Sequence, residues 1–220
     1  MVLNKNKGFT LIELLVVISI IVIILIISFL SFTRNKEIIS LQSDSENLLL
    51  NIRKSQSLAM AVNNAGSGNY QNGYGVYFNM DHNNGVYLQD TDPFSYILFT
   101  DFENTLGSKD WDRAYLENHT NVNCGNPVGL ISECVQKIKT NDNNYILSLE
   151  LCDTYCSSTD ILTITFLRPN LDAYFCTTPT SLGGCNTPIS AGYAKITLKS
   201  PQTGKSKVIY VWSTGQISIE

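Results

Sequence analysis

The sequence predicts an α+β protein, in which a long N-terminal helix precedes a head built of antiparallel sheet. The first observation is an apolar run over residues 14–32, interrupted only by three serines. The second is the polar, Asn-rich and glycine-punctuated chain that follows, with short runs of β-branched and aromatic residues. Its 220 residues suit one ordinary domain plus an appendage. We therefore expect one membrane helix and one soluble head.

The helix is predicted to extend from Phe9 to Asn64. Its apolar run, Leu14–Phe32, has the length that crosses a bilayer, which takes about 20 residues. No proline or glycine interrupts residues 33–64, and Asn63–Gly66 supplies a stop signal. Residues 9–32 would then span the membrane or polymerise, while residues 33–65 pack on the head. One helical face recurs at steps of three and four: Ile38, Leu41, Ser45, Leu48, Ile52, Ser55, Ala59 and Val62.

The head, residues 66–220, contains eight predicted strands bounded by Asn, Asp, Gly or Pro. A turn at Ser200–Gly204 joins the last two long strands, and Thr214-Gly215 precedes a terminal one. The expected strands are Tyr74–Asn79, Gly85–Gln89, Tyr96–Thr100, Tyr145–Leu151, Ile161–Leu167, Tyr193–Leu198, Lys207–Trp212 and Gln216–Ile219.

Charge and cysteine placement orient the chain. Lys5 and Lys7 precede the apolar run and favour a cytoplasmic N-terminus, although Arg34 and Lys36 after the run weaken the asymmetry. All six cysteines lie in the C-terminal half, which favours disulfides in an oxidising compartment. Both signals place the head outside the cytoplasm. The six cysteines are Cys124, Cys134, Cys152, Cys156, Cys176 and Cys185.

The cysteine spacing permits local pairing. Cys124/Cys134, Cys152/Cys156 and Cys176/Cys185 are each close enough in sequence for a bridge, although six cysteines allow fifteen connectivities. Zinc is the alternative, but it prefers two closely spaced pairs, and Cys152/Cys156 alone has that spacing. We therefore favour disulfides over a metal and expect no cofactor.

The apolar run and the residues before it differ from an ordinary secretory signal. Such a signal has a shorter apolar core followed by small residues, whereas Phe29, Leu30 and Phe32 end this one. The segment Lys5–Glu13, K-N-K-G-F-T-L-I-E, closely resembles the prepilin signature. This resemblance implies that prepilin peptidase removes residues 1–8 by cleavage between Gly8 and Phe9, and methylates the new N-terminus at Phe9.

Glu13 is an acidic residue within an otherwise apolar segment. A carboxylate at mid-membrane costs about 2.5–3.5 kcal/mol, so it is usually retained for a function. Glu13 matches the pilin glutamate that is thought to meet the N-terminal amine of a neighbouring subunit. The alternative is a side chain that snorkels to the interface of a simple anchor. Unlike many pilins, residues 16–32 contain no proline, which predicts a straighter helix.

Three head segments resemble the GspH/FimT-type minor pseudopilin domain: Leu48–Ala59, Tyr74–Phe78 and Lys207–Ile217. The resemblance implies a structural subunit of a type II secretion pseudopilus or type IV pilus in the inner membrane, and not an enzyme. Its partners would be prepilin peptidase, other pilins, membrane lipid and the inner-membrane assembly platform. A membrane-tethered adhesin stays open, and would use the unplaced insert Ser108–Cys185.

Other candidate sites have weaker patterns. His82 and His119 lack a catalytic constellation and are interpreted as loop residues. The segments Asp81–Asn84 and Asn141–Asn144 could offer oxygen ligands to calcium, but turn chemistry is favoured because neither has EF-hand spacing.

A lysine group on the last hairpin could bind DNA in a transformation pilin. Against nucleic acid, the formal net charge is −4, and it becomes −6 when Lys5 and Lys7 leave with the leader. A solvated strand face is favoured for these lysines, which are Lys195, Lys199, Lys205 and Lys207.

Overall fold

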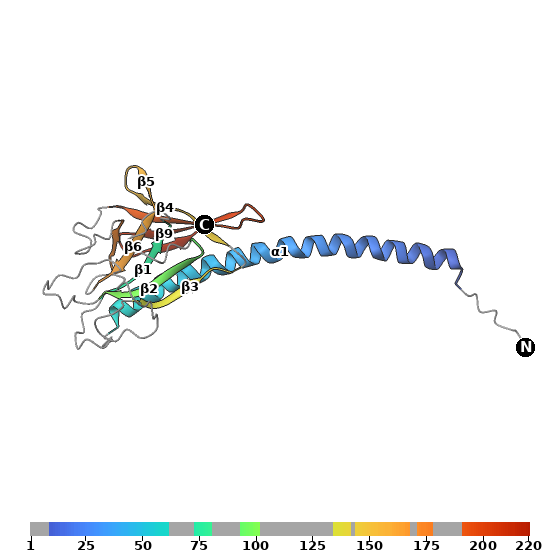
Figure 1. Ribbon diagram of the computed structural model, residues 1–220, viewed down its shortest axis with the longest axis horizontal. Helices are drawn as coiled ribbons and strands as arrows, with labels where there is room; N and C mark the ends of the chain where they lie inside the picture. Colours follow the sequence, from blue (N-terminus) through green and yellow to red (C-terminus); the bar gives the residue numbers. More distant parts are fainter. Residues whose placement is uncertain are drawn as a thin grey trace, which may run out of the picture.

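The computed structural model describes residues 9–61, 73–80, 93–101, 134–141, 144–167, 171–177 and 191–220. A single 50-residue helix, α1 (Leu11–Met60), enters the head with its C-terminal half, while its N-terminal half projects away from the head (Figure 1). At 1.5 Å per residue, α1 is about 75 Å long. The described part of the head contains ten strands and no helix besides α1, so the predicted α+β class is confirmed.

The strands form two five-stranded sheets in which every neighbouring pair is antiparallel. The first sheet, in spatial order, contains β3 (Cys134–Lys139), β2 (Ser95–Asp101), β1 (Gly73–Asn79), β6 (Ile161–Phe166) and β7 (Ala173–Cys176). The second contains β10 (Ile217–Ile219), β9 (Ser206–Trp212), β8 (Tyr193–Lys199), β4 (Tyr145–Cys152) and β5 (Cys156–Thr159).

The main hydrophobic core lies where α1 meets both sheets. The predicted helical face is the buried one: Leu48 and Ile52 are fully buried, and Ser45 and Ser55 lie on the same face. Apolar residues from β1, β2, β6 and β7 join residues from β4, β8, β9 and β10 in this cluster. Each fully buried Leu or Ile stabilises the fold by about 1.5–3 kcal/mol. The second half of α1 is therefore a core element of the head.

The first sheet is buried on both faces at its centre. Every residue of β1 and β2 is buried, and a second small cluster contains Tyr77, Ile97, Phe99 and Cys134. Gly75 of β1 allows the close packing here, since a Cβ would lie 2.4 Å from the carbonyl oxygen of Ile164. Because both faces are buried, these two strands lack the alternation of buried and exposed residues that a half-exposed strand shows.

The structure differs from the sequence prediction at the helix end and in three strands. Ala61 has an extended backbone (φ −67°, ψ 138°), so α1 ends at Met60 and not at Asn64; residues 62–64 lie outside the described residues. Valine and asparagine follow, which are poor helix formers. Strands β3, β5 and β7 were not predicted, and the expected strand Gly85–Gln89 lies outside the described residues.

Candidate functional site

The N-terminal turn of α1 positions Glu13. Thr10 is the N-cap residue, and its Oγ1 accepts a hydrogen bond from the Glu13 backbone N–H at 3.3 Å. The Thr10 carbonyl accepts from the backbone N–H of Glu13 and of Leu14. Glu13 thus stands three residues after the cap, where a carboxylate interacts favourably with the helix dipole. Sequence reasoning missed this role of Thr10, although the spacing T-x-x-E signals it.

The segment after Glu13 presents apolar side chains on every side. Residues Leu11–Phe29 have the length and composition of a membrane span, and none of that window is buried in the head. The Ser19 hydroxyl donates back to the carbonyls of Leu15 and Val16, at 2.9 Å each. Its polar group is therefore satisfied within the helix, as hydrocarbon requires. Phe9 is 79% exposed, and Gly8 lies outside the described residues.

Comparison with known protein families gives one match, to the prokaryotic N-terminal methylation motif, over residues 3–29. The N-terminus of the chain is therefore of the prepilin type. The match covers both sides of the predicted cleavage site between Gly8 and Phe9, and most of the apolar segment. Comparisons with curated proteins and with solved structures found no match. The pilin-like character therefore rests on the N-terminus together with the α+β architecture.

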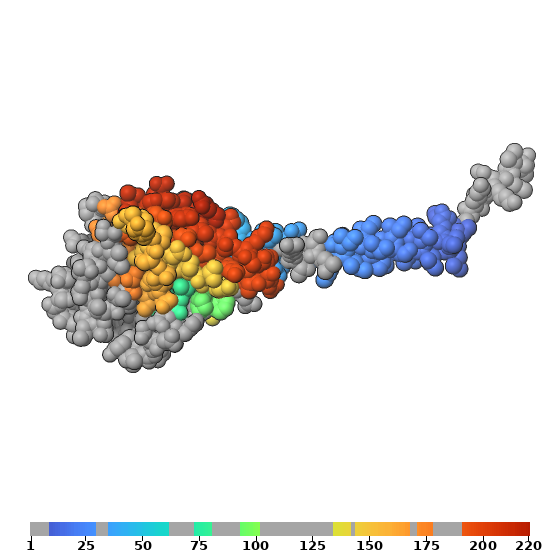
Figure 2. Space-filling model, turned by 90° about the horizontal axis from the view of Figure 1, so that it is seen from above, coloured from blue at the N-terminus to red at the C-terminus, as the bar shows by residue number. Residues whose placement is uncertain are grey.

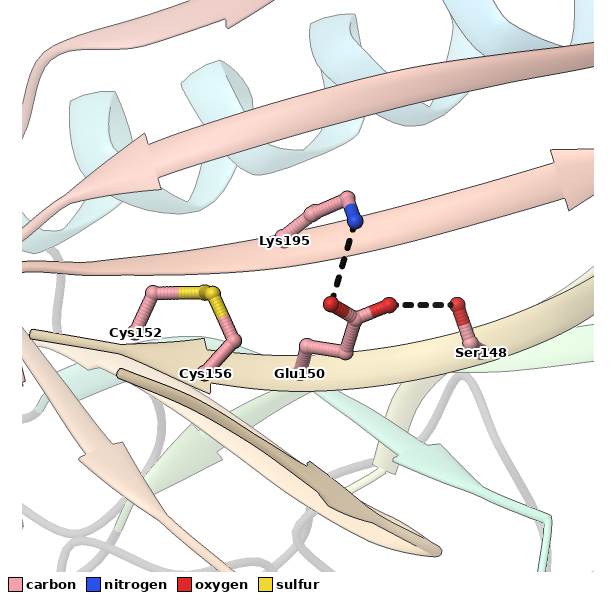
Figure 3. Close-up of a disulfide and its surroundings, with 5 residues drawn as sticks. All are labelled: Ser148, Glu150, Cys152, Cys156 and Lys195. Carbon is pink, nitrogen blue, oxygen red and sulfur yellow. Dashed lines mark hydrogen bonds and ion pairs between the residues drawn. A yellow bond between two sulfur atoms is a disulfide. The ribbon is translucent and has the colours of Figure 1, made fainter.

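The four described cysteines are all disulfide-bonded. Cys152 ends β4 and Cys156 begins β5, where they are register partners and form a disulfide (Figure 3). Cys134 and Cys176 are also disulfide-bonded. Their predicted partners, Cys124 and Cys185, lie outside the described residues. Those two pairings stay predictions.

The disulfide also bears on the zinc alternative. Glu150 Oε2 accepts from Lys195 Nζ at 3.0 Å, and its Oε1 accepts from the Ser148 hydroxyl at 3.1 Å (Figure 3). Glu150, Cys152 and Cys156 are close enough together to hold a metal, but zinc binds thiolates, and these two sulfurs are bonded to each other. In this oxidised state the cluster stabilises the β4–β5 hairpin.

A buried carboxylate on α1 holds the turn between β3 and β4. Asp44 is 4% exposed and accepts from Asn141 N (2.9 Å), Asn141 Nδ2 (2.6 Å) and Asn144 Nδ2 (2.7 Å). Asn144 Nδ2 also donates to the Ser40 hydroxyl at 3.2 Å. These amides donate to the protein, which agrees with turn chemistry rather than calcium binding for the described residues of this segment. Asp142 and Asn143 lie outside them.

Sequence reasoning did not identify Asp44. The signal was its place on the buried helical face, three residues after Leu41 and four before Leu48. A carboxylate at such a position must be hydrogen-bonded when buried, which predicts a partner elsewhere in the chain. Asn141 and Asn144 are these partners.

A polar hollow of about 240 Å³ adjoins this contact, between α1 and the first sheet. One of its lining residues is Tyr96, whose hydroxyl accepts from Asn51 Nδ2 at 3.0 Å. Burial raises the pKa of Tyr96 above its ordinary value, despite the opposing hydrogen bond from Asn51. Tyr96 therefore stays protonated at neutral pH and cannot serve there as a base. The lining residues are Asp44, Asn47, Asn51, Tyr96, Gln136, Ile138, Lys139 and Thr140.

The remaining sequence candidates fall in two groups. His82, His119 and the segment Asp81–Asn84 lie outside the described residues. Lys195 is paired with Glu150 and is thereby neutralised locally, whereas Lys199, Lys205 and Lys207 lie further along the same hairpin.

Proposed function

We propose that the protein is a minor subunit of a type IV pilus or of a type II secretion pseudopilus. It is processed by prepilin peptidase between Gly8 and Phe9 and waits in the inner membrane as a single-pass protein with its head outside the cytoplasm. It then joins a filament through α1. The observation that carries this proposal is the methylation motif, followed at once by a continuous helix with exposed apolar side chains. Its role is structural.

The exposed half of α1 supplies the driving force for assembly. Large apolar side chains from Leu11 to Phe29 are 47–82% exposed in the isolated chain. They require either lipid or the helices of neighbouring subunits around them, because apolar surface in water costs about 25 cal/mol per Å². The same helix can therefore leave the bilayer for a filament core without a change of its own structure.

Glu13 would set the register between subunits. It lies in the first turn of α1, four residues after Phe9, which precedes the helix. A neighbour displaced along the helix axis relative to this chain would bring its Phe9 amine level with Glu13. Pairing the two removes an isolated carboxylate and an isolated ammonium from an apolar interior, where each is costly alone.

Contacts in the head support the GspH/FimT-type assignment. The three segments that carry the resemblance lie at the end of α1, in β1, and across β9 and β10. The first and last meet directly, since Gln56 Nε2 donates to the Gly215 carbonyl at 2.9 Å. Gly215 has φ +80°, and a Cβ there would lie 2.1 Å from the Leu171 carbonyl oxygen. The turn therefore depends on glycine where the helix docks.

Intact-mass and N-terminal analysis of the membrane-extracted protein tests the proposal. The protein is expressed with and without prepilin peptidase, and the expected product of co-expression is a chain that begins with methylated Phe9. A Gly8→Leu variant serves as the matched control, because a bulky residue at the cleavage site should block processing and leave the helix intact. An uncut N-terminus in the wild type under both conditions would contradict the assignment.

A further inference from the structure

The end of the head from which α1 emerges carries four lysines that we call the basic rim: Lys139, Lys199, Lys205 and Lys207. Lys139 is the last residue of β3 and Lys199 the last of β8, while Lys205 and Lys207 lie at the start of β9. Lys139 and Lys205 are exposed, and the other two are partly exposed. Within the described residues, none of the four forms an ion pair with a carboxylate.

The hairpin of β8 and β9 extends along α1 toward its N-terminal half (Figure 1). Seen from above, the same red hairpin lies at the end of the head where the helix leaves it (Figure 2). The β3–β4 turn lies at the same end, because Asn144 contacts Ser40 and Asp44 of α1. Lys139 is two residues before Asn141 in that turn. The four lysines therefore lie at the end of the head from which α1 emerges.

The distance from the bilayer follows from the helix. Ser40 lies eight residues after Phe32, the end of the apolar run, which is about 12 Å along the axis. Headgroups occupy about 5–7 Å beyond the hydrocarbon core on each side. The remaining gap is about 5–7 Å, which is less than the Debye length of roughly 8 Å at physiological salt. Charges on the rim therefore act on the lipid surface without strong screening.

The nearby charges leave the rim net positive. Glu37 on α1 adjoins Lys36 in the sequence, Asp44 lines the same hollow as Lys139, and the Glu220 backbone pairs with that of Val208, next to Lys207 in β9. Glu220 Oε2 also accepts from the Tyr210 hydroxyl at 3.4 Å. Among the described residues, three carboxylates thus stand near the four rim lysines and Lys36, in a chain whose formal net charge is −4. The rim is therefore positively charged, although the whole protein carries a net negative charge.

We propose that the basic rim binds the phosphate groups of anionic lipids in the membrane that holds α1. The inference rests on the membrane-anchored state in the proposed function. A lysine near an anionic bilayer contributes about a five-fold gain in occupancy, and several act together. Such a contact holds the head against the membrane before assembly and remains reversible because salt weakens it. Duplex DNA fits this surface less well, since lipid phosphates at the same end would repel it.

Covalent labelling of lysines tests the proposal. The full chain is reconstituted in nanodiscs of phosphatidylcholine alone or mixed with phosphatidylglycerol, and lysine acetylation rates are measured by mass spectrometry. We expect Lys199, Lys205 and Lys207 to react about two- to five-fold more slowly in the anionic discs. Lys54, exposed near the far end of α1, is the internal reference and should react equally in both. High salt should remove the difference, because the Debye length falls to about 3 Å at 1 M.

A triple variant, K199Q/K205Q/K207Q, provides the matched control. Loss of the hairpin charges should also return the labelling rate of Lys139 in anionic discs to its value in neutral discs. Equal labelling rates for the wild type in both kinds of disc would overturn the proposal. It would also be overturned if anionic lipid had no effect and labelling in neutral discs became slower only when duplex DNA was added. The discs contain no peptidase, so either result leaves the processing test untouched. Failure of the chain to co-elute with the discs would instead refute membrane anchoring and the rim together.

Discussion

Replacing Asp44 by alanine removes the common acceptor of three hydrogen bonds. The carboxylate is buried, and its donors are the Asn141 backbone, the Asn141 side chain and the Asn144 side chain. A hydrogen bond to a charged group is worth about 1.5–3 kcal/mol when buried. Asn141 is exposed and can turn to water, and Asn144 keeps its bond to Ser40. We therefore expect a loss of about 3–4 kcal/mol, which is less than the sum of about 4.5–9 kcal/mol for three separate bonds.

Thermal unfolding of the full chain in detergent measures this loss. Near-UV circular dichroism reports on the head, because all 11 tyrosines and both tryptophans follow residue 66. A chain of this size shifts its Tm by about 2–4 °C per kcal/mol, so Asp44→Ala should lower the Tm by about 6–16 °C.

Glu46→Ala is the matched control for Asp44→Ala. Glu46 is a carboxylate on the same helix, two residues away, and its Oε1 accepts from Gln42 Nε2 at 2.6 Å on the exposed face. Exposed pairs of this spacing stabilise by about 0.2–0.5 kcal/mol, so the Tm should fall by no more than about 2 °C. Equal shifts for the two variants would refute the reasoning that the buried Asp44 contact fixes the β3–β4 turn to α1.

Three further predictions concern the N-terminus, a turn and a buried tyrosine. Glu13→Ala should leave processing intact but reduce the fraction of protein in sheared filaments; unchanged incorporation would remove the pairing with a neighbour's amine. Gly215→Ala should cost at least about 2 kcal/mol in denaturant unfolding, because φ is +80° and a Cβ meets the Leu171 carbonyl. Gly204→Ala, with φ +67° and open space, should cost less, so a larger loss there would contradict the steric argument. Tyr96→Phe should cost about 1 kcal/mol at neutral pH. Because burial raises the pKa of Tyr96 above 10.0, the unfolded chain loses this proton first, and wild-type stability should fall above about pH 10 more steeply than that of the variant. Parallel pH curves for the two proteins would show that Tyr96 makes no such contribution.

The sequence predicted the elements whose signal is local. The buried face of α1 followed from helical spacing, and β1, β6, β8 and β9 followed from dense β-branched and aromatic runs. The sequence could not predict β5, whose residues Cys156–Thr159 contain no large apolar side chain, or the short β7. Strand β3 has outward lysine and glutamine side chains, which hide its pattern. The division into two sheets depends on distant pairings such as β1 with β6, and periodicity does not encode these.

The candidate site divides in the same way. Gly8, Phe9 and Glu13 stand in a contiguous motif, so a family comparison could recognise the N-terminus from a few residues. The partners of Asp44 are about 100 residues away in sequence, and only the fold brings them together. In a long-range hydrogen bond of this kind, the sequence pattern indicates only one of the two partners. Here that partner is the carboxylate on an apolar helical face.

The continuity of α1 has a mechanical consequence. The same helix that projects from the head also contributes Leu48 and Ile52 to its core, with no loop or hinge between the two halves. A pull along the N-terminal half therefore loads the core in shear, parallel to the helix axis. Many side-chain contacts and the hydrogen bonds of Asp44 must then break together rather than one after another. The helix that projects from the head is thus also part of its core, so the head resists detachment for as long as this core stays folded.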